Sequence, residues 1–109
     1  MHVTIDGEAT PTEKWSIAGV YGYCRESVAL AKMTLISGPH VTASQGHLYG
    51  IAILAESHVS VHLDKRSGRA HLDLFSCNDF EIERWVNYSR DWFTLSKLQT
   101  TKIDRGLYG

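Results

Sequence analysis

The sequence has little of what stabilises secreted or membrane proteins. Its two cysteines, Cys24 and Cys77, form no CxxC pair and are too few for a disulfide framework, so we expect free thiols in a reducing setting. No apolar run approaches the ~20 residues of a membrane span. The first residues lack the basic region and apolar core of a signal peptide, which predicts a cytoplasmic protein.

An excess of charge of one sign is also absent. The net charge is −1, and basic and acidic residues are mixed along the chain. This composition gives no indication of binding to nucleic acid or to an anionic membrane surface. The 109 residues predict a single domain, residues 1–109. Because a domain of this size buries only about two thirds of its surface on folding, a partner subunit would help to stabilise it.

Hydrophobic periodicity predicts the order strand, helix, three or four strands, helix, strand. The expected strands cover residues 2–8, 40–44, 48–55, 58–63, 69–76 and 98–103. The alternation is clear around the fourth strand, where Val59, Val61 and Leu63 share one face. This order is typical of an α+β fold, and we expect a two-layer sandwich with two helices packed on one face of an antiparallel sheet.

The helix boundaries are predicted from their capping residues. A threonine, a proline and a glutamate within residues 10–13 make a good helix start. This first helix is expected to run to about Ile36 and to stop at residues 37–39, which are Ser-Gly-Pro. The second helix is expected to follow Asn78 as its N-cap, with Glu81 at the third helical position.

One strand-like run contains a pair of residues with no obvious packing purpose, Glu56 and Ser57. A serine hydroxyl can attack the carbonyl group of the residue before it, which converts the amide into an ester. Elimination across Ser57 then breaks the chain, and hydrolysis leaves a pyruvoyl group in its place. The pyruvoyl ketone can form a Schiff base with a substrate amine and act as the electron sink of a decarboxylation, so no external cofactor is required.

The residues around this bond resemble a known family. His62 follows Ser57 by five positions and Cys77 follows it by twenty. The matching segments are Leu54-Ala55-Glu56-Ser57-His58-Val59-Ser60-Val61-His62 and Asp73-Leu74-Phe75-Ser76-Cys77. They resemble the prokaryotic, single-repeat type of S-adenosylmethionine decarboxylase, which serves polyamine (spermidine) biosynthesis. The resemblance implies a proenzyme that cleaves itself into chains 1–56 and 57–109, a pyruvoyl group at Ser57, a role for His62 in processing, and Cys77 as proton donor after CO2 departs.

Strand geometry limits how these residues can meet. If residues 64–68 form a hairpin turn, Ser57 faces Phe75, and Cys77 is its diagonal neighbour about 7–8 Å away. Cys77 can therefore serve Ser57 of its own chain. His62 cannot, because five strand residues span roughly 16 Å and an odd spacing places the two side chains on opposite faces. We therefore expect a symmetric homodimer with sites at or near its interface.

The positions that bind the nucleoside in this family differ here. The resemblance implies an aromatic residue that stacks on the adenine, six positions before a serine, and this chain has Ala43 and Tyr49 there. It also implies an acid within a Trp-Pro-Glu run after the second histidine, where this chain has Asp64, Lys65 and Arg66. Tyr49 could donate a proton in the serine's place and Asp64 could reach a ribose, so both are candidate substrate-binding residues.

Three functions remain open at the level of sequence. The first is decarboxylation of S-adenosylmethionine. The second is the same pyruvoyl chemistry on a basic amino acid such as ornithine or arginine. The third is a non-catalytic paralogue that regulates an active partner subunit. His58 and His62 lie four apart on one strand face, but two ligands without a third make a weak metal site, so we expect no metal.

Overall fold

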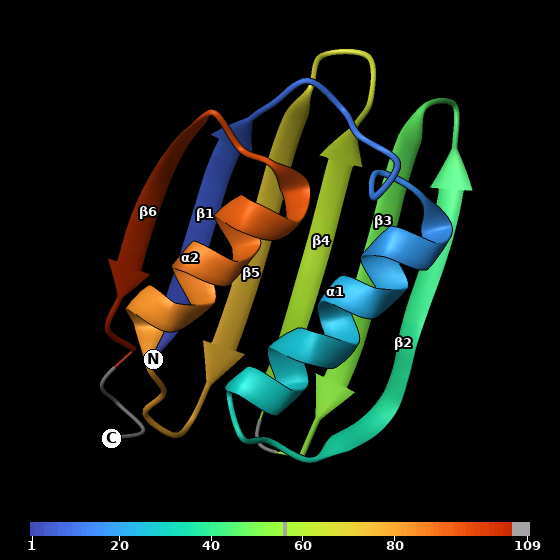
Figure 1. Ribbon diagram of the computed structural model, residues 1–109. Coiled ribbons are helices and arrows are strands. Elements are labelled where there is room, and N and C mark those ends of the chain that lie inside the picture. The colour runs from blue at the N-terminus through green and yellow to red at the C-terminus, as the bar shows by residue number, and fades with distance from the viewer. Residues whose placement is uncertain (56, 106–109) are drawn as a thin grey trace.

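The computed structural model describes residues 1–55 and 57–105 of the chain. Within them it has six strands and two helices. They are β1 (His2–Glu8), α1 (Ile17–Leu30), β2 (Leu35–Ser44), β3 (His47–Leu54), β4 (Ser57–Asp64), β5 (Arg69–Ser76), α2 (Ile82–Phe93) and β6 (Lys97–Ile103). The strands form one antiparallel sheet in the order β2-β3-β4-β5-β1-β6. Both helices cover the same face of this sheet (Figure 1), which confirms the predicted two-layer α+β sandwich.

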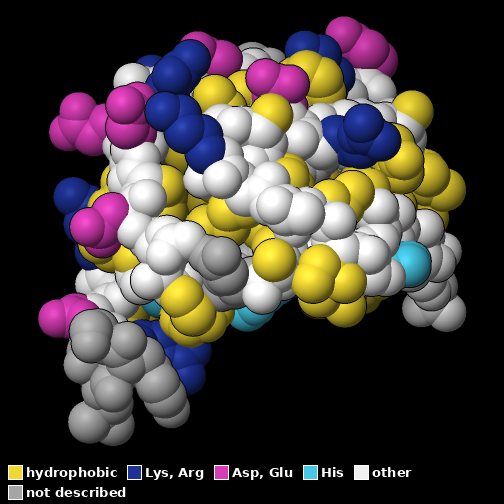
Figure 2. Space-filling model, turned by 90° about the horizontal axis from the view of Figure 1, so that it is seen from below, with side chains coloured by type: hydrophobic (Ala, Val, Ile, Leu, Met, Phe, Trp, Pro, Cys, Tyr) yellow, Lys and Arg dark blue, Asp and Glu magenta, His cyan; other side chains and the backbone are white. Residues whose placement is uncertain are grey.

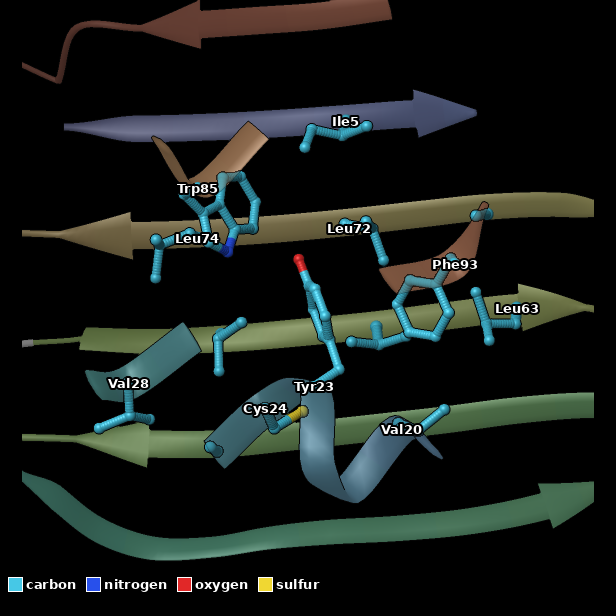
Figure 3. Packing of buried hydrophobic residues seen from close by; sticks show 14 of the residues in the cluster. Ile5, Val20, Tyr23, Cys24, Val28, Leu63, Leu72, Leu74, Trp85 and Phe93 are labelled. Atoms are coloured by element: carbon cyan, nitrogen blue, oxygen red, sulfur yellow. The ribbon is translucent and has the colours of Figure 1, made fainter. Parts of the chain in front are cut away.

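The core lies between the sheet and the two helices. Alternate strand residues point toward the helices, and Val59, Val61 and Leu63 of β4 are buried there as expected. Figure 3 shows the strand side chains of this layer meeting Tyr23 of α1 and Trp85 of α2. The opposite face of the sheet has no helix over it among the described residues, and we call it the open face.

Hydrogen bonds between buried polar groups join the two helices. The Tyr23 hydroxyl lies 2.6 Å from Ser89 Oγ, and the Trp85 indole N–H donates to Ser27 Oγ at 3.1 Å. All four side chains are buried, so an unpaired group here would lose hydration without compensation. Burial raises the pKa of the Tyr23 hydroxyl well above its ordinary value, which keeps it neutral.

The first helix is shorter than predicted at both ends. It begins after Ser16, whose hydroxyl accepts the Gly19 N–H at 3.0 Å, and not after Thr10. It ends at Leu30, since Lys32 already has a positive φ of 56°. The preceding segment cannot continue the helix because Trp15 is buried, and its indole N–H donates to the Phe93 carbonyl across the core. A tertiary contact therefore overrides the cap signal at residues 10–13.

The Ser-Gly-Pro segment lies inside strand β2 and does not end the helix. Pairing with β3 is irregular there, with register shifts between Leu35 and Ser37 and between Ser37 and His40. Because β2 is an edge strand, Pro39 can lack an N–H without breaking the interior of the sheet. Gly38 has a φ of 96°, which a residue with a side chain rarely adopts.

The second helix also starts later than predicted, at Ile82 with Glu81 as its N-cap. Asn78 instead forms part of a tight turn, in which its N–H donates to Ser76 Oγ at 2.9 Å. The turn is fixed by Ser76, which is fully buried at the end of β5. Neither helix of the described residues is long and apolar enough to cross a membrane.

Two glycines let α1 lie close to its neighbours. A side chain on Gly19 would place its Cβ 1.8 Å from the Lys14 carbonyl oxygen, and one on Gly50 of β3 would place it 2.5 Å from Val20 Cγ1. Gly50 therefore allows the helix to pack directly against the sheet. This position is in the strand that leads to Ser57, so the close approach helps to fix that strand in the sandwich.

Candidate active site

Ser57 is the first residue of β4 and lies beside the end of β5. Its hydroxyl oxygen accepts the backbone N–H of Cys77 at 3.1 Å. The Cys77 side chain is a free, exposed thiol. Ser57 and Cys77 are therefore neighbours within one chain, as the sequence predicts. Glu56, the other residue of the predicted cleavage site, lies outside the described residues.

The pairing between β4 and β5 differs by one residue from the predicted register. Ser57 faces Ser76, and Phe75 faces His58 instead. Cys77 is thus the residue after the partner of Ser57 and not a diagonal neighbour two positions along. The prediction took residues 64–68 entirely as turn, whereas β4 continues through Asp64, which pairs with Arg69.

His62 lies on the other face of the same strand. Ser57 belongs to the set that includes the buried Val59 and Val61, whereas His62 belongs to the set on the open face. Five residues of strand also separate the two along the sheet, a span of roughly 16 Å. The structure therefore does not bring His62 to Ser57 of its own chain, as the spacing predicts.

His62 instead forms a cluster with two side chains of β3. His47 Nδ1 lies 3.0 Å from His62 Nε2, and the two rings are stacked with centroids 5.2 Å apart. Tyr49 stacks on His62 at 4.7 Å with nearly parallel planes. We call His47, Tyr49 and His62 the His62 cluster. His71 of β5 flanks it, with its ring centroid 5.8 Å from that of His62.

The surroundings of His62 lower the pKa of its imidazole below the ordinary value. Partial desolvation is the largest cause, followed by the nearby rings of His47 and His71, while Asp64 acts in the opposite direction. The imidazole is therefore biased toward its neutral form, in which one ring nitrogen can accept a proton. A neutral histidine held between aromatic rings is suited to general-base chemistry.

Asp64 lies at the far end of β4 from Ser57. It pairs directly with His47 of β3, and its carboxylate accepts the Arg66 backbone N–H at 3.0 Å. Desolvation acts to raise the pKa of Asp64, but hydrogen bonds from Ser67 and the backbone outweigh it, so the pKa is lowered overall. The predicted site residues thus form two groups in one chain, Ser57 with Cys77 and the His62 cluster with Asp64.

The open face carries all six histidines of the chain. They are His2, His40, His47, His58, His62 and His71. A groove of about 550 Å³ crosses the centre of this face, and His62 and Tyr49 line it while Ser57 and Cys77 do not. In Figure 2 most charged side chains lie on the upper, helical side and on the left, and the histidines in view lie at the lower and right margins.

Sequence reasoning missed several partners of these residues. His71 Nδ1 lies 2.7 Å from Asp6 Oδ1, and His2 pairs with Asp73. His47 lies one residue before the strand expected over residues 48–55, and no role was predicted for it. Strand alternation could have placed these side chains on one face, but their contacts depend on which strands are neighbours. Within the described residues, no group of three His, Cys, Asp or Glu side chains is arranged to hold a metal ion.

The surroundings of Ser57 fit the formation of a pyruvoyl group. The Ser57 hydroxyl is held by a donor from the backbone, so its own proton remains free to leave. The residue is only partly buried, which allows water to reach it for the hydrolysis that ends the processing. The Cys77 thiol is exposed beside it and can supply a proton there.

Comparison with known proteins gives a consistent result. Residues 1–106 match the family described as S-adenosylmethionine decarboxylase. An S-adenosylmethionine decarboxylase proenzyme of Clostridium kluyveri is 34% identical over 71 residues, which are 63% of this chain and 55% of that protein. The corresponding proenzyme of Methanococcus vannielii is 35% identical over 69 residues, 62% of this chain and 56% of that protein.

The fold has a close counterpart among solved structures. The adenosylmethionine decarboxylase of Aquifex aeolicus superposes with a TM-score of 0.78, covering 95% of this chain and 92% of that one at 19% identity. The chain spans about half the length of the curated relatives it matches. Since the family match extends over nearly the whole sequence, the chain belongs to the S-adenosylmethionine decarboxylase family.

Proposed function

We propose that this chain is a self-processing S-adenosylmethionine decarboxylase whose pyruvoyl cofactor forms from Ser57. Family membership supports the reaction, and relatives named as proenzymes support self-cleavage. The observation that carries the proposal is the 3.1 Å contact between Ser57 Oγ and the Cys77 backbone N–H. This contact keeps Ser57, the nucleophile of self-cleavage, next to Cys77, the proposed proton donor of the decarboxylation.

Processing at Ser57 needs three steps. Its Oγ attacks the carbonyl carbon of Glu56, the peptide C–N bond breaks, and the freed nitrogen takes the hydroxyl proton, which leaves an ester. A base removes the Cα proton of Ser57, the Cβ–O bond breaks, and Glu56 leaves as the carboxylate end of chain 1–56. One water then replaces the nitrogen at Cα, ammonia departs, and a ketone remains. We assign the base to His62, which is biased toward its neutral form.

Cys77 takes part in the later reaction. The pyruvoyl ketone, once formed, supplies the electron sink that a decarboxylation needs. Loss of CO2 leaves a carbon that must receive a proton. Cys77 has a free, exposed thiol, and its backbone N–H contacts the Ser57 side chain. We therefore assign proton donation to Cys77.

A homodimer would bring the two groups of site residues together, with one group from each subunit at a site. His62 acts on a Ser57 that lies beyond its reach within one chain, so the proposal places it at Ser57 of the partner subunit. The open face is suited to self-association because Tyr49, Ile51 and Ile53 of β3 expose 41–44% of their surface there. A two-fold axis would give two equivalent sites at or near the interface.

The nucleoside substrate is favoured over a basic amino acid by the family match. The alternative of ornithine or arginine rests only on the departures at the adenine and ribose positions. Ala43 offers no ring to the adenine, but Tyr49 presents one at the groove, stacked on His62. Asp64 lies two positions from His62 and is held ionised by its hydrogen bonds, so it remains the candidate for binding the ribose of the substrate.

Denaturing mass measurement tests the self-cleavage. The purified protein should give two chains, residues 1–56 and 57–109, and the second should react with hydroxylamine through its ketone. Ser57→Ala should give one intact chain, whereas Ser60→Ala, on the same strand but the open face, should still be cut. A single uncut polypeptide from the unchanged sequence would contradict the proposal.

Release of CO2 from labelled substrates tests the specificity. S-adenosylmethionine should be turned over, and ornithine and arginine should not. Cys77→Ala should still be processed into two chains but should lose most turnover. Processing without turnover of any of the three substrates would instead favour a non-catalytic, regulatory paralogue.

A further inference from the structure

His62 is proposed to act on Ser57 of the partner subunit. Within its own chain it also contacts His47. The two residues come from neighbouring strands, and His47 Nδ1 lies 3.0 Å from His62 Nε2. Tyr49 stacks on one face of the His62 ring at 4.7 Å. The ring is therefore held by one polar contact at its edge and one aromatic contact at its face. Such a histidine has a fixed orientation rather than a freely rotating side chain.

The short contact between two imidazole rings requires one of them to donate. If His47 donates through Nδ1–H, it occupies the lone pair of His62 Nε2, and the other nitrogen of neutral His62 carries the hydrogen. No basic nitrogen is then left on His62. If His62 donates through Nε2–H, its Nδ1 keeps a free lone pair. Only the second arrangement makes His62 a base.

We propose that His47 is a positioning residue for His62, accepting the His62 Nε2–H at its own Nδ1 so that His62 Nδ1 stays free to remove a proton. This inference rests on the proposed role of His62 in processing. His47 is not among the motif residues Ser57, His62 and Cys77. In His47 the remaining nitrogen, Nε2, then carries its hydrogen.

The charges around His62 are compatible with this assignment. Asp64 pairs with His47 across β3 and β4 and interacts electrostatically with it. On the other side, His71 from β5 faces His62, and its Nδ1 is engaged with Asp6 of β1 at 2.7 Å. His71 Nδ1 is therefore not available to the His62 nitrogen. Tyr49 is a further titratable group that faces the ring.

Two substitutions of His47 separate its hydrogen bond from its ring. His47→Phe keeps an aromatic ring beside Tyr49 and His62 but removes the acceptor. His47→Asn removes the ring but places an amide oxygen near the position of Nδ1. His40→Phe is the matched control, because His40 is a histidine of the same face whose ring nitrogen contacts Ser37 Oγ at 2.8 Å.

The first measurement reads the hydrogen on His62 directly and does not depend on activity. In the Ser57→Ala protein, which should remain one chain, long-range proton–nitrogen NMR should show His62 as the Nε2–H tautomer. Adding His47→Phe should shift His62 toward a mixture of tautomers, and His40→Phe should not. An Nδ1–H tautomer of His62 in the Ser57→Ala protein without a second substitution would overturn the inference. It would do so even if the protein of unchanged sequence cleaves itself.

The second measurement is the rate of self-cleavage against pH in freshly synthesised precursor. At neutral pH His47→Phe should cleave at least about tenfold more slowly, because base catalysis typically contributes 10²–10⁴-fold. His47→Asn should recover to within about threefold of the unchanged protein. Both should move the acid limb of the rate profile to higher pH, since each removes the His47 imidazole, whose positive charge opposes protonation of His62.

These outcomes separate the inference from the proposed function. If the unchanged precursor never cleaves, the proposed function is wrong, and the tautomer of His62 still decides whether His47 orients it. If the precursor cleaves and His47→Phe cleaves equally fast, the positioning role is wrong while the function stands. Equal loss of rate in His47→Phe and His47→Asn with both folded would also contradict the inference, since it would show that the ring and not the acceptor matters.

Discussion

The two faces of this sheet differ in chemistry although they alternate along the same strands. Toward the helices, β4 presents Val59 and Val61, which are buried among other apolar side chains. Toward the open side the same strand presents His58, Ser60 and His62. The helical face thus forms the packed apolar core, whereas the open face carries paired titratable groups and exposed apolar side chains. The packing that stabilises the fold therefore lies mainly on the helical face, whereas the proposed base His62 and the proposed assembly surface lie on the open face.

The largest contrast should appear when similar side chains are truncated on the two faces. Leu74→Ala, on the helical face of β5 and fully buried, should cost about 2–5 kcal/mol of unfolding free energy. Ile53→Ala, on the open face of β3, should cost about 0.5 kcal/mol or less in the monomer. Urea unfolding at low protein concentration measures both. Equal costs would mean that the open face contributes to the core.

Thiol labelling should show a contrast between the two cysteines. Cys24 is fully buried in α1, and burial raises the pKa of its thiol to about 12, while Cys77 is exposed. Cys77 should therefore alkylate at least about a hundredfold faster, because Cys24 must wait for the structure to open. Mass spectrometry of peptides carrying each residue gives both rates. Comparable rates in the native protein would contradict the packing of α1 on the sheet.

A charge placed on the open face should break the proposed dimer. Ile51→Glu puts a carboxylate in the middle of that face and should weaken self-association by about tenfold or more, since a buried unpaired charge is costly. Ile17→Glu is the control, because Ile17 is similarly exposed but lies on α1. Sedimentation equilibrium measures both. An unchanged dimer in Ile51→Glu would place the interface elsewhere.

The smallest expected effect is a pH dependence of stability that originates at His62. Its pKa is lowered on folding, so the unfolded chain binds more protons as the pH falls below about 6.5. The contribution of His62 should be constant above that pH and be lost as the pH falls through the folded pKa. Subtracting the unfolding free energies of His62→Gln from those of the unchanged protein isolates it. A difference that grows in favour of the unchanged protein on acidification would contradict the lowered pKa.

Much of the fold could be predicted because local patterns and tertiary contacts agree. The alternation of β4 and β5 fixed which residues enter the core, and the element order fixed the two-layer architecture. The caps at Thr10 and Asn78 misled, since the burial of Trp15 and the turn at Ser76 moved both helix starts. The pairing of β4 and β5 was one residue off because the turn is shorter than assumed.

The candidate site divides in the same way. The spacing of Ser57, His62 and Cys77 is a property of the chain, and strand period alone shows that His62 cannot reach Ser57 of its own chain. The contact of Cys77 with Ser57 depends also on the register of β4 and β5, which the prediction placed one residue off. The contact of His47 with His62 is not visible in spacing, because it joins two strands, β3 and β4, and depends on the register in which they pair.

The sequence by itself determined the reactive residues, the α+β class and the inward face of each strand, because these follow from residue type and from the two-residue period of a strand. Tertiary structure decided where the helices begin, which residue faces Ser57, and which rings surround His62. Those features depend on how strands pair and on what the core can bury, and neither is a local property of the chain.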